Sequence, residues 1–98
     1  MNTLEGLLGI EPRSREVQRA EALADSDCAL LRALVAVRKK RGLSQQEVGE
    51  IMGVSQASVS QFEAHDSNPT LATIRRYAHA VGALVTHHVE ADDVYGAC

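Results

Sequence analysis

Apolar residues recur every three to four positions through most of the chain, which is the spacing of an amphipathic helix. The first such run, at 13–25, carries only a thin apolar stripe and predicts a short helix. The second run carries a broad apolar face and ends before Gly42. Asp25, Ser26 and Asp27 precede that face, and these residue types favour a helix N-terminus. The pattern therefore predicts two separate helices before residue 42.

Two very short helices follow, separated by one glycine. Ser44 and Glu47 have the spacing of a capping box, so a helix is expected to begin at Ser44. Gly53 is expected to end it in a left-handed conformation, and Ser55 is expected to cap the next helix. The second of these helices places small polar residues where a core helix would carry leucine.

One more helix and a strand complete the pattern. Thr70 is expected to cap a helix that Gly82 ends, and the β-branched run "ALVTHHVE" after it predicts a strand. The residues expected in the core are the apolar members of these helix faces: Leu30, Leu31, Leu34, Val35, Val37, Val48, Ile51, Met52, Val59, Phe62, Leu71, Ile74, Ala78 and Val81.

Composition narrows the function classes. At 98 residues and 45% hydrophobic, the chain suits one small domain with an aliphatic core. The net charge of -3 argues against nucleic acid, but residues 29–90 hold seven Lys and Arg against five Asp and Glu. No signal peptide and no membrane-spanning run is recognised, so a cytoplasmic protein is expected. Cys28 and Cys98 lack metal-site or disulfide spacing and are interpreted as reduced thiols.

The two short helices resemble a helix-turn-helix motif. Counted from Gln45, the fifth residue is Gly49, the ninth is Gly53 and the fifteenth is Val59, which supplies small residues where two steeply crossed helices meet. The stretch "GLSQQEVGEIMGVSQASVSQFEAHDSNPTLATIRRYAHAVG" resembles the Xre family, which includes the lambda-type repressors. The resemblance implies an all-α, lambda-repressor-like domain at 29–82. A 1–28 extension with an extra helix would precede it, and an 83–98 strand and tail would follow it.

The resemblance also implies a DNA-reading helix at Gln56 to Phe62 that enters the major groove. Gln45 is similar in position to a family residue that contacts phosphate. The basic cluster formed by Arg38, Lys39, Lys40 and Arg41, in the last turn of the helix before Gly42, either complements the helix dipole or contacts phosphate. The DNA-binding residues expected on this basis are Gln45, Gln56, Ala57, Ser58, Ser60, Gln61, Lys39, Lys40, Arg41 and, as a weaker candidate, Asn68.

Arg38 and Glu63 hold positions similar to a structural ion pair of the family. Such a pair, if buried, would set the angle between the helices that carry it. The family favours glycine two residues after this glutamate, but here the residue is His65, so the turn after the DNA-reading helix is expected to differ.

Metal and enzyme chemistry find little support in the sequence. His87 and His88 are adjacent and would point to opposite faces of a strand, while His65 and His79 lack ligands at helical spacing. No glycine-rich phosphate loop follows a strand, and no nucleophile has a base beside it. We expect no metal, no cofactor and no enzymatic activity.

The leading hypothesis is a homodimeric, sequence-specific transcriptional regulator that represses from a palindromic operator on double-stranded DNA. Dimerisation is expected across an antiparallel strand pair formed by Leu84, Val85, Thr86, His87 and Val89. The strand after the last core helix is similar to the arrangement in HigA-type antitoxins, so the first alternative is an antitoxin that binds a toxin and represses its own operon. The second is a protein-binding adaptor that keeps the motif only as a scaffold.

Overall fold

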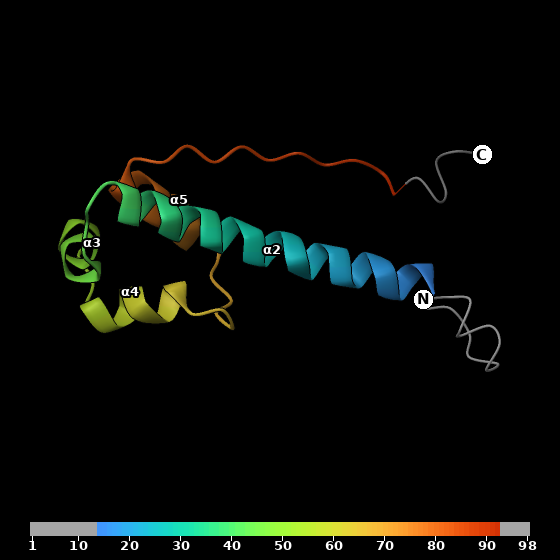
Figure 1. Cartoon of the computed structure of the whole chain (residues 1–98), viewed down its shortest axis with the longest axis horizontal. Helices are drawn as coiled ribbons and strands as arrows, with labels where there is room; N and C mark the ends of the chain where they lie inside the picture. The colour runs from blue at the N-terminus through green and yellow to red at the C-terminus, as the bar shows by residue number, and fades with distance from the viewer. Residues whose placement is uncertain (1–13, 93–98) are drawn as a thin grey trace. The chain divides into compact units, whose positions relative to one another are not determined.

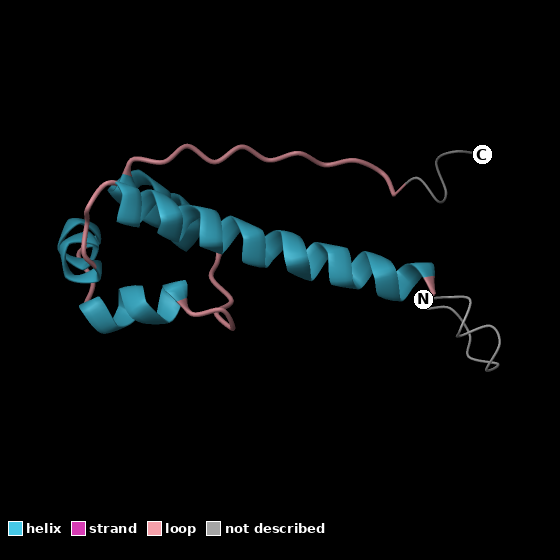
Figure 2. Ribbon diagram, viewed as in Figure 1, coloured by secondary structure: helices cyan, strands magenta, loops and turns pink. Residues whose placement is uncertain are grey.

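The computed structural model of the chain describes residues 14–92, and the regular secondary structure in that range is all α-helix. The elements are α2 (Arg15–Lys40), α3 (Gln45–Met52), α4 (Gln56–Glu63) and α5 (Leu71–Val81), shown in Figures 1 and 2. Residues 1–13 and 93–98 lie outside the described residues, and with them Cys98 and the ends of the expected extension and tail. None of the helices between residues 14 and 92 has the length and apolar character of a membrane span.

The described chain divides into two compact units. One consists of residues 27–88 and holds the end of α2 together with α3, α4 and α5. Its core is formed by eight buried side chains: Leu31, Leu34, Val48, Val59, Phe62, Tyr77, Ala78 and Val81. All of the described helices of this unit contribute to that core, so it fixes how α3 and α4 are held.

The other unit joins residues 14–26 to residues 89–92. Within it, the guanidinium groups of Arg15 and Arg19 both bind the carboxylate of Asp92, with Arg19 Nε 2.8 Å from Oδ2. These side chains are partly exposed, so the ion pairs contribute little to stability.

The prediction of two separate helices before residue 42 is wrong, because α2 runs without interruption from Arg15 to Lys40. Asp25, Ser26 and Asp27 are exposed positions inside it rather than a new N-terminus. A break there would create two more helix ends with unsatisfied backbone groups and a second nucleation cost. The flanking residues are good helix formers, so continuation is favoured.

The predicted C-terminal strand is also absent from the described residues. Residues 83–92 carry no regular secondary structure, and no other segment within 14–92 offers a strand to pair with them. Ala83 and Val85 pack against the core, whereas Leu84 is 98% exposed. Residues 86–90 are all exposed, so only the beginning of the run is anchored to the core and no sheet forms.

Two expected core residues lie on the surface instead. Ile51 is 56% exposed and Leu71 is 67% exposed. In α3 the inward positions are Val48, Gly49 and Met52, which leaves Ile51 on the adjoining face of a helix only eight residues long. Leu71 is the first residue of α5, one turn before the residues that reach the core.

Candidate nucleic-acid interface

The turn between α3 and α4 is built by two glycines that act in different ways. Gly53 ends α3 with φ 75°, a left-handed conformation that side chains with a Cβ rarely adopt. Gly49 is buried inside α3, and a Cβ there would lie 2.8 Å from the carbonyl oxygen of Val54. The close approach of α3 to the turn therefore requires a residue without a side chain at position 49.

Side-chain caps start both helices of the motif. Ser44 Oγ accepts from the Glu47 backbone N–H, and the Glu47 carboxylate accepts from the Ser44 backbone N–H, so the predicted capping box is present. Ser55 Oγ accepts from the backbone N–H of Ser58 at the start of α4. These local bonds satisfy N–H groups that have no partner within the helix.

Helix α4 has one buried and one exposed face. Val59 and Phe62 point into the core, and the Phe62 ring stacks on Tyr77 with ring centroids 4.4 Å apart. The face turned to solvent carries the residues that the sequence proposed for base contacts, and all of them are exposed: Gln56, Ala57, Ser58, Ser60 and Gln61. The polar composition of this helix is therefore not needed for the core.

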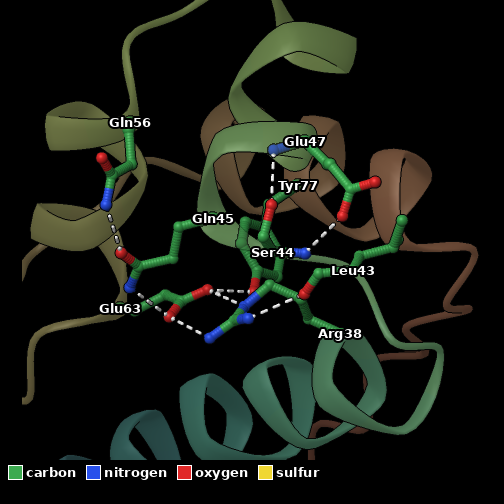
Figure 3. A network of polar contacts seen from close by, with 8 residues as sticks. All are labelled: Arg38, Leu43, Ser44, Gln45, Glu47, Gln56, Glu63 and Tyr77. Atoms are coloured by element: carbon green, nitrogen blue, oxygen red, sulfur yellow. Dashed lines mark hydrogen bonds and ion pairs between the residues drawn. The ribbon is translucent and has the colours of Figure 1, made fainter.

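A buried carboxylate holds the C-terminal end of α4 to its neighbours. Arg38 donates to both oxygens of Glu63, over 2.6 Å from Nε and 3.0 Å from Nη2, and its Nη1 donates to the Leu43 carbonyl. The Tyr77 hydroxyl donates to Glu63 Oε2. Figure 3 shows Glu63 surrounded by these groups and by Gln45. The network ties α2, α4 and α5 together at one point.

The charges in this network are mutually stabilised. Burial alone would raise the pKa of the Glu63 carboxyl, but hydrogen bonds from Arg38, Tyr77 and Gln45 outweigh it and hold the pKa below its usual value. The hydrogen bond to Glu63 raises the pKa of the Arg38 guanidinium. Burial, together with the neighbouring carboxylate, raises the pKa of the Tyr77 hydroxyl. Glu63 is therefore ionised and Tyr77 neutral at physiological pH.

Gln45 connects this network to the exposed face of α4. Its Nε2 donates to Glu63 Oε1 over 3.0 Å, and its Oε1 accepts from Gln56 Nε2 over 3.3 Å. In Figure 3 the Gln45 side chain lies between the Gln56 amide and the buried carboxylate. The structure thus brings together two residues that the sequence named for different contacts.

The side chains of the basic cluster lie in different surroundings. Lys39 and Lys40 are exposed at the end of α2. Arg41 Nη2 donates to the carbonyl of Gly82 over 3.0 Å, which satisfies an acceptor at the C-terminal end of α5. Arg41 therefore stabilises the end of α5, whereas Lys39 and Lys40 extend into solvent.

The loop after α4 differs from a glycine-terminated turn, as the presence of His65 predicted. Ala64 ends the helix in an extended conformation, with φ -66° and ψ 145°. Ser67 Oγ donates to the Phe62 carbonyl over 2.7 Å and closes the turn without a left-handed residue. Asn68 follows on the surface of this loop.

Sequence reasoning missed the part that Tyr77 plays in the site. Tyr77 is fully buried, stacks on Phe62 and donates to Glu63. Its position offered a signal, because it lies three residues after Ile74 and four before Val81 on the apolar face of α5. Within residues 14–92, no cluster of three or more His, Cys, Asp or Glu side chains is arranged to hold a metal ion.

Comparison with known proteins finds a matching family and several similar proteins. A helix-turn-helix family model matches residues 34–83, about half of the chain. Antitoxin HigA1 of Mycobacterium tuberculosis is 52% identical over 54 residues, which cover 55% of this chain and 36% of HigA1. The putative antitoxin HigA3 of the same organism is 38% identical over 71 residues, 68% of this chain and 65% of HigA3. Antitoxin HipB of Escherichia coli is 38% identical over 61 residues, 62% of this chain and 69% of HipB.

This chain spans about a third of the length of HigA1. No solved structure was found to match it. The family match covers the end of α2, both short helices, α5 and the glycine that ends α5. On the strength of that match and of the motif geometry, the chain belongs to the helix-turn-helix family of Xre type.

Proposed function

We propose that the protein is a sequence-specific DNA-binding transcriptional regulator, a repressor that acts as a homodimer on a palindromic operator. The observation that carries the proposal is the two-sided character of α4. Its apolar side chains are fixed in the core, while its outer face is exposed and polar although the fold does not require it. A helix presented in this way fits the major groove of B-DNA, where side-chain amides and hydroxyls meet base edges. We take residues 29–82 as the DNA-binding domain.

The exposed residues of α4 make different contacts with the DNA in this proposal. Gln56, in the first turn, pairs with adenine through its amide, which both accepts and donates. The Ala57 methyl contacts a thymine methyl, and the hydroxyls of Ser58 and Ser60 and the amide of Gln61 bond to base edges or to phosphate.

Phosphate contacts come from residues around α4. Gln45 stands at the N-terminus of α3, where backbone N–H groups favour an anion. Lys39 and Lys40 supply exposed positive charge, and Arg41 adds to it while it holds the end of α5. Asn68 lies on the exposed loop after α4 and is the weakest of these candidates.

The dimer is proposed to form through the segment that contains Leu84, Val85, Thr86, His87 and Val89, paired with the same segment of a second copy. Leu84 is 98% and Val89 is 91% exposed, and this segment has no strand partner within residues 14–92. Two copies of α4 would then read half-sites about one helical turn, roughly 34–36 Å, apart.

Two alanine variants test the proposal. Gln56→Ala should weaken binding to the native operator by about 1–3 kcal/mol per half-site and relax preference at one base position in each half. Lys40→Ala should instead weaken binding to all duplexes and flatten the dependence of affinity on salt. The measurement is a fluorescence-anisotropy titration on operators selected from a random duplex library. Wild-type protein that prefers no duplex would refute the proposal and leave the adaptor as the better account.

The names of three similar proteins favour a second candidate function. HigA1, HigA3 and HipB are all called antitoxins, although HigA3 only putatively. An antitoxin would bind a partner toxin and repress its own operon, which adds a protein partner to the same DNA-binding domain. Co-purification of this chain with the product of an adjacent gene, and rescue of growth when both are expressed, would establish the antitoxin function. Full toxicity of that product in the presence of this chain would reject it.

A further inference from the structure

Two hydrogen bonds link the buried Glu63 carboxylate through Gln45 to Gln56 at the exposed N-terminal end of α4, and they fix the orientation of both amides. A carboxylate only accepts, so the Gln45 amide must turn its NH2 group toward Glu63. The Gln45 carbonyl oxygen then faces Gln56, and Gln56 must present its own NH2 group to it. Each amide has only one orientation that satisfies its neighbour, as the dashed lines in Figure 3 trace.

This orientation decides what Gln56 can offer to a base. One of its two N–H groups is used on Gln45, which leaves one N–H donor and the carbonyl acceptor. Adenine presents one acceptor and one donor in the major groove and matches that pair. Guanine presents two acceptors, N7 and O6, so the Gln56 oxygen would face a second oxygen.

We infer that Glu63, which is buried away from the exposed face of α4, is a specificity-determining residue that makes Gln56 select adenine over guanine by orienting the Gln45 amide. The inference rests on the proposed function, because it assumes that Gln56 reads a base. It assigns Glu63 a second role beside its ion pair with Arg38: the fixed acceptor at the head of a three-residue relay.

Substitution by glutamine is expected to reverse the relay. Glu63 Oε2 receives the two shortest bonds of the network, from Arg38 Nε at 2.6 Å and from the Tyr77 hydroxyl at 2.5 Å, so in Glu63→Gln we expect the single amide oxygen to stay at that position. The new NH2 group then occupies the position of Oε1, where it faces Gln45 and displaces Arg38 Nη2 from its acceptor. Gln45 must flip to accept from it, and Gln56 must turn its oxygen inward and both N–H groups toward the groove.

The experiment compares base preference at the position read by Gln56. Matched operators that carry adenine or guanine there are titrated with wild type and with Glu63→Gln, under conditions where circular dichroism shows both proteins to be folded. We expect the adenine-over-guanine affinity ratio to fall by roughly tenfold in Glu63→Gln, with preferences at other positions unchanged. An unchanged ratio in the folded variant would overturn the inference.

Two further variants separate the relay from loss of stability. Val81→Ala removes buried apolar contacts but no partner of Glu63, so it lowers the melting temperature and should leave the ratio unchanged. Gln45→Met keeps the Arg38–Glu63 pair and breaks the relay, so it should lower the ratio even if Glu63→Gln does not fold. A ratio that survives in Gln45→Met overturns the relay, whereas wild-type protein without any base preference refutes the proposed function itself.

Discussion

Arg38 is a buried charged residue, with 9% of its surface exposed. Removing its side chain would leave the Glu63 carboxylate buried without its counter-ion. Arg38→Ala should therefore lower the free energy of unfolding by about 3–5 kcal/mol in urea denaturation. The control is Lys40→Ala, an exposed change that should cost less than about 0.5 kcal/mol. Equal stability of the two variants would show that the pair does not hold α4.

Titration of Glu63 predicts how stability depends on pH. Its pKa is lowered in the folded state from an ordinary value of 4.5, so the unfolded chain binds the proton more readily. The stabilisation is present above about pH 4.5 and is lost as the pH falls through the folded-state pKa. The melting-temperature difference between wild type and Glu63→Gln should thus shrink below that pH. A difference that stays constant from pH 7 to pH 3 would argue against an ionised, paired Glu63.

At the scale of elements, the crossing of α3 and α4 depends on Gly49 and Gly53 for different reasons. Gly49→Ala puts a methyl 2.8 Å from a backbone oxygen and should cost about 1–3 kcal/mol. Gly53→Ala meets no neighbouring atom but is strained at φ 75°, which costs about 1–2 kcal/mol.

Asparagine distinguishes these two causes. It tolerates the left-handed conformation, so Gly53→Asn should recover much of the stability lost in Gly53→Ala. Gly49→Asn should be at least as damaging as Gly49→Ala, because any Cβ meets the same oxygen. Urea denaturation of the four variants measures this. Recovery at both positions would mean that the turn relaxes and that close packing at Gly49 is not limiting.

For the whole molecule, the prediction concerns the segment after α5. Because Ala83 and Val85 pack on the core, deletion of the segment would disturb the fold as well as the proposed dimer. Leu84→Glu changes only a side chain that is 98% exposed and should weaken the dimer without lowering the stability of the monomer. Sedimentation velocity at micromolar concentration measures this. Ile51→Glu, an exposed change on α3, serves as the control and should remain dimeric.

If Leu84→Glu is still dimeric, the interface lies elsewhere. Val17 and Leu23 are exposed apolar residues on the first part of α2 and form the alternative surface. Glutamate substitutions at these two positions would then be expected to produce monomers. The dimer prediction fails entirely if the wild-type chain sediments as a monomer.

The sequence by itself determined the parts that depend on neighbouring residues. The capping box at Ser44, the left-handed end at Gly53, the caps at Ser55 and Thr70 and the inward face of α4 are all local, because each is decided within one or two helical turns. Once these were placed in register, the helix-turn-helix motif and its exposed polar face followed. The family match agrees with that part of the prediction.

Only the tertiary structure decided the rest, because the contacts concerned join residues far apart in the chain. Whether "ALVTHHVE" becomes a strand depends on a partner for its backbone groups, and residues 14–92 contain none. The continuity of α2 is an exception, because it involves no distant contact and reflects a local balance between caps and helix propensity that no single residue sets. The relay from Glu63 through Gln45 to Gln56 exists because α3 crosses α4 closely enough to bring three side chains, 18 and 11 positions apart, within hydrogen-bonding distance.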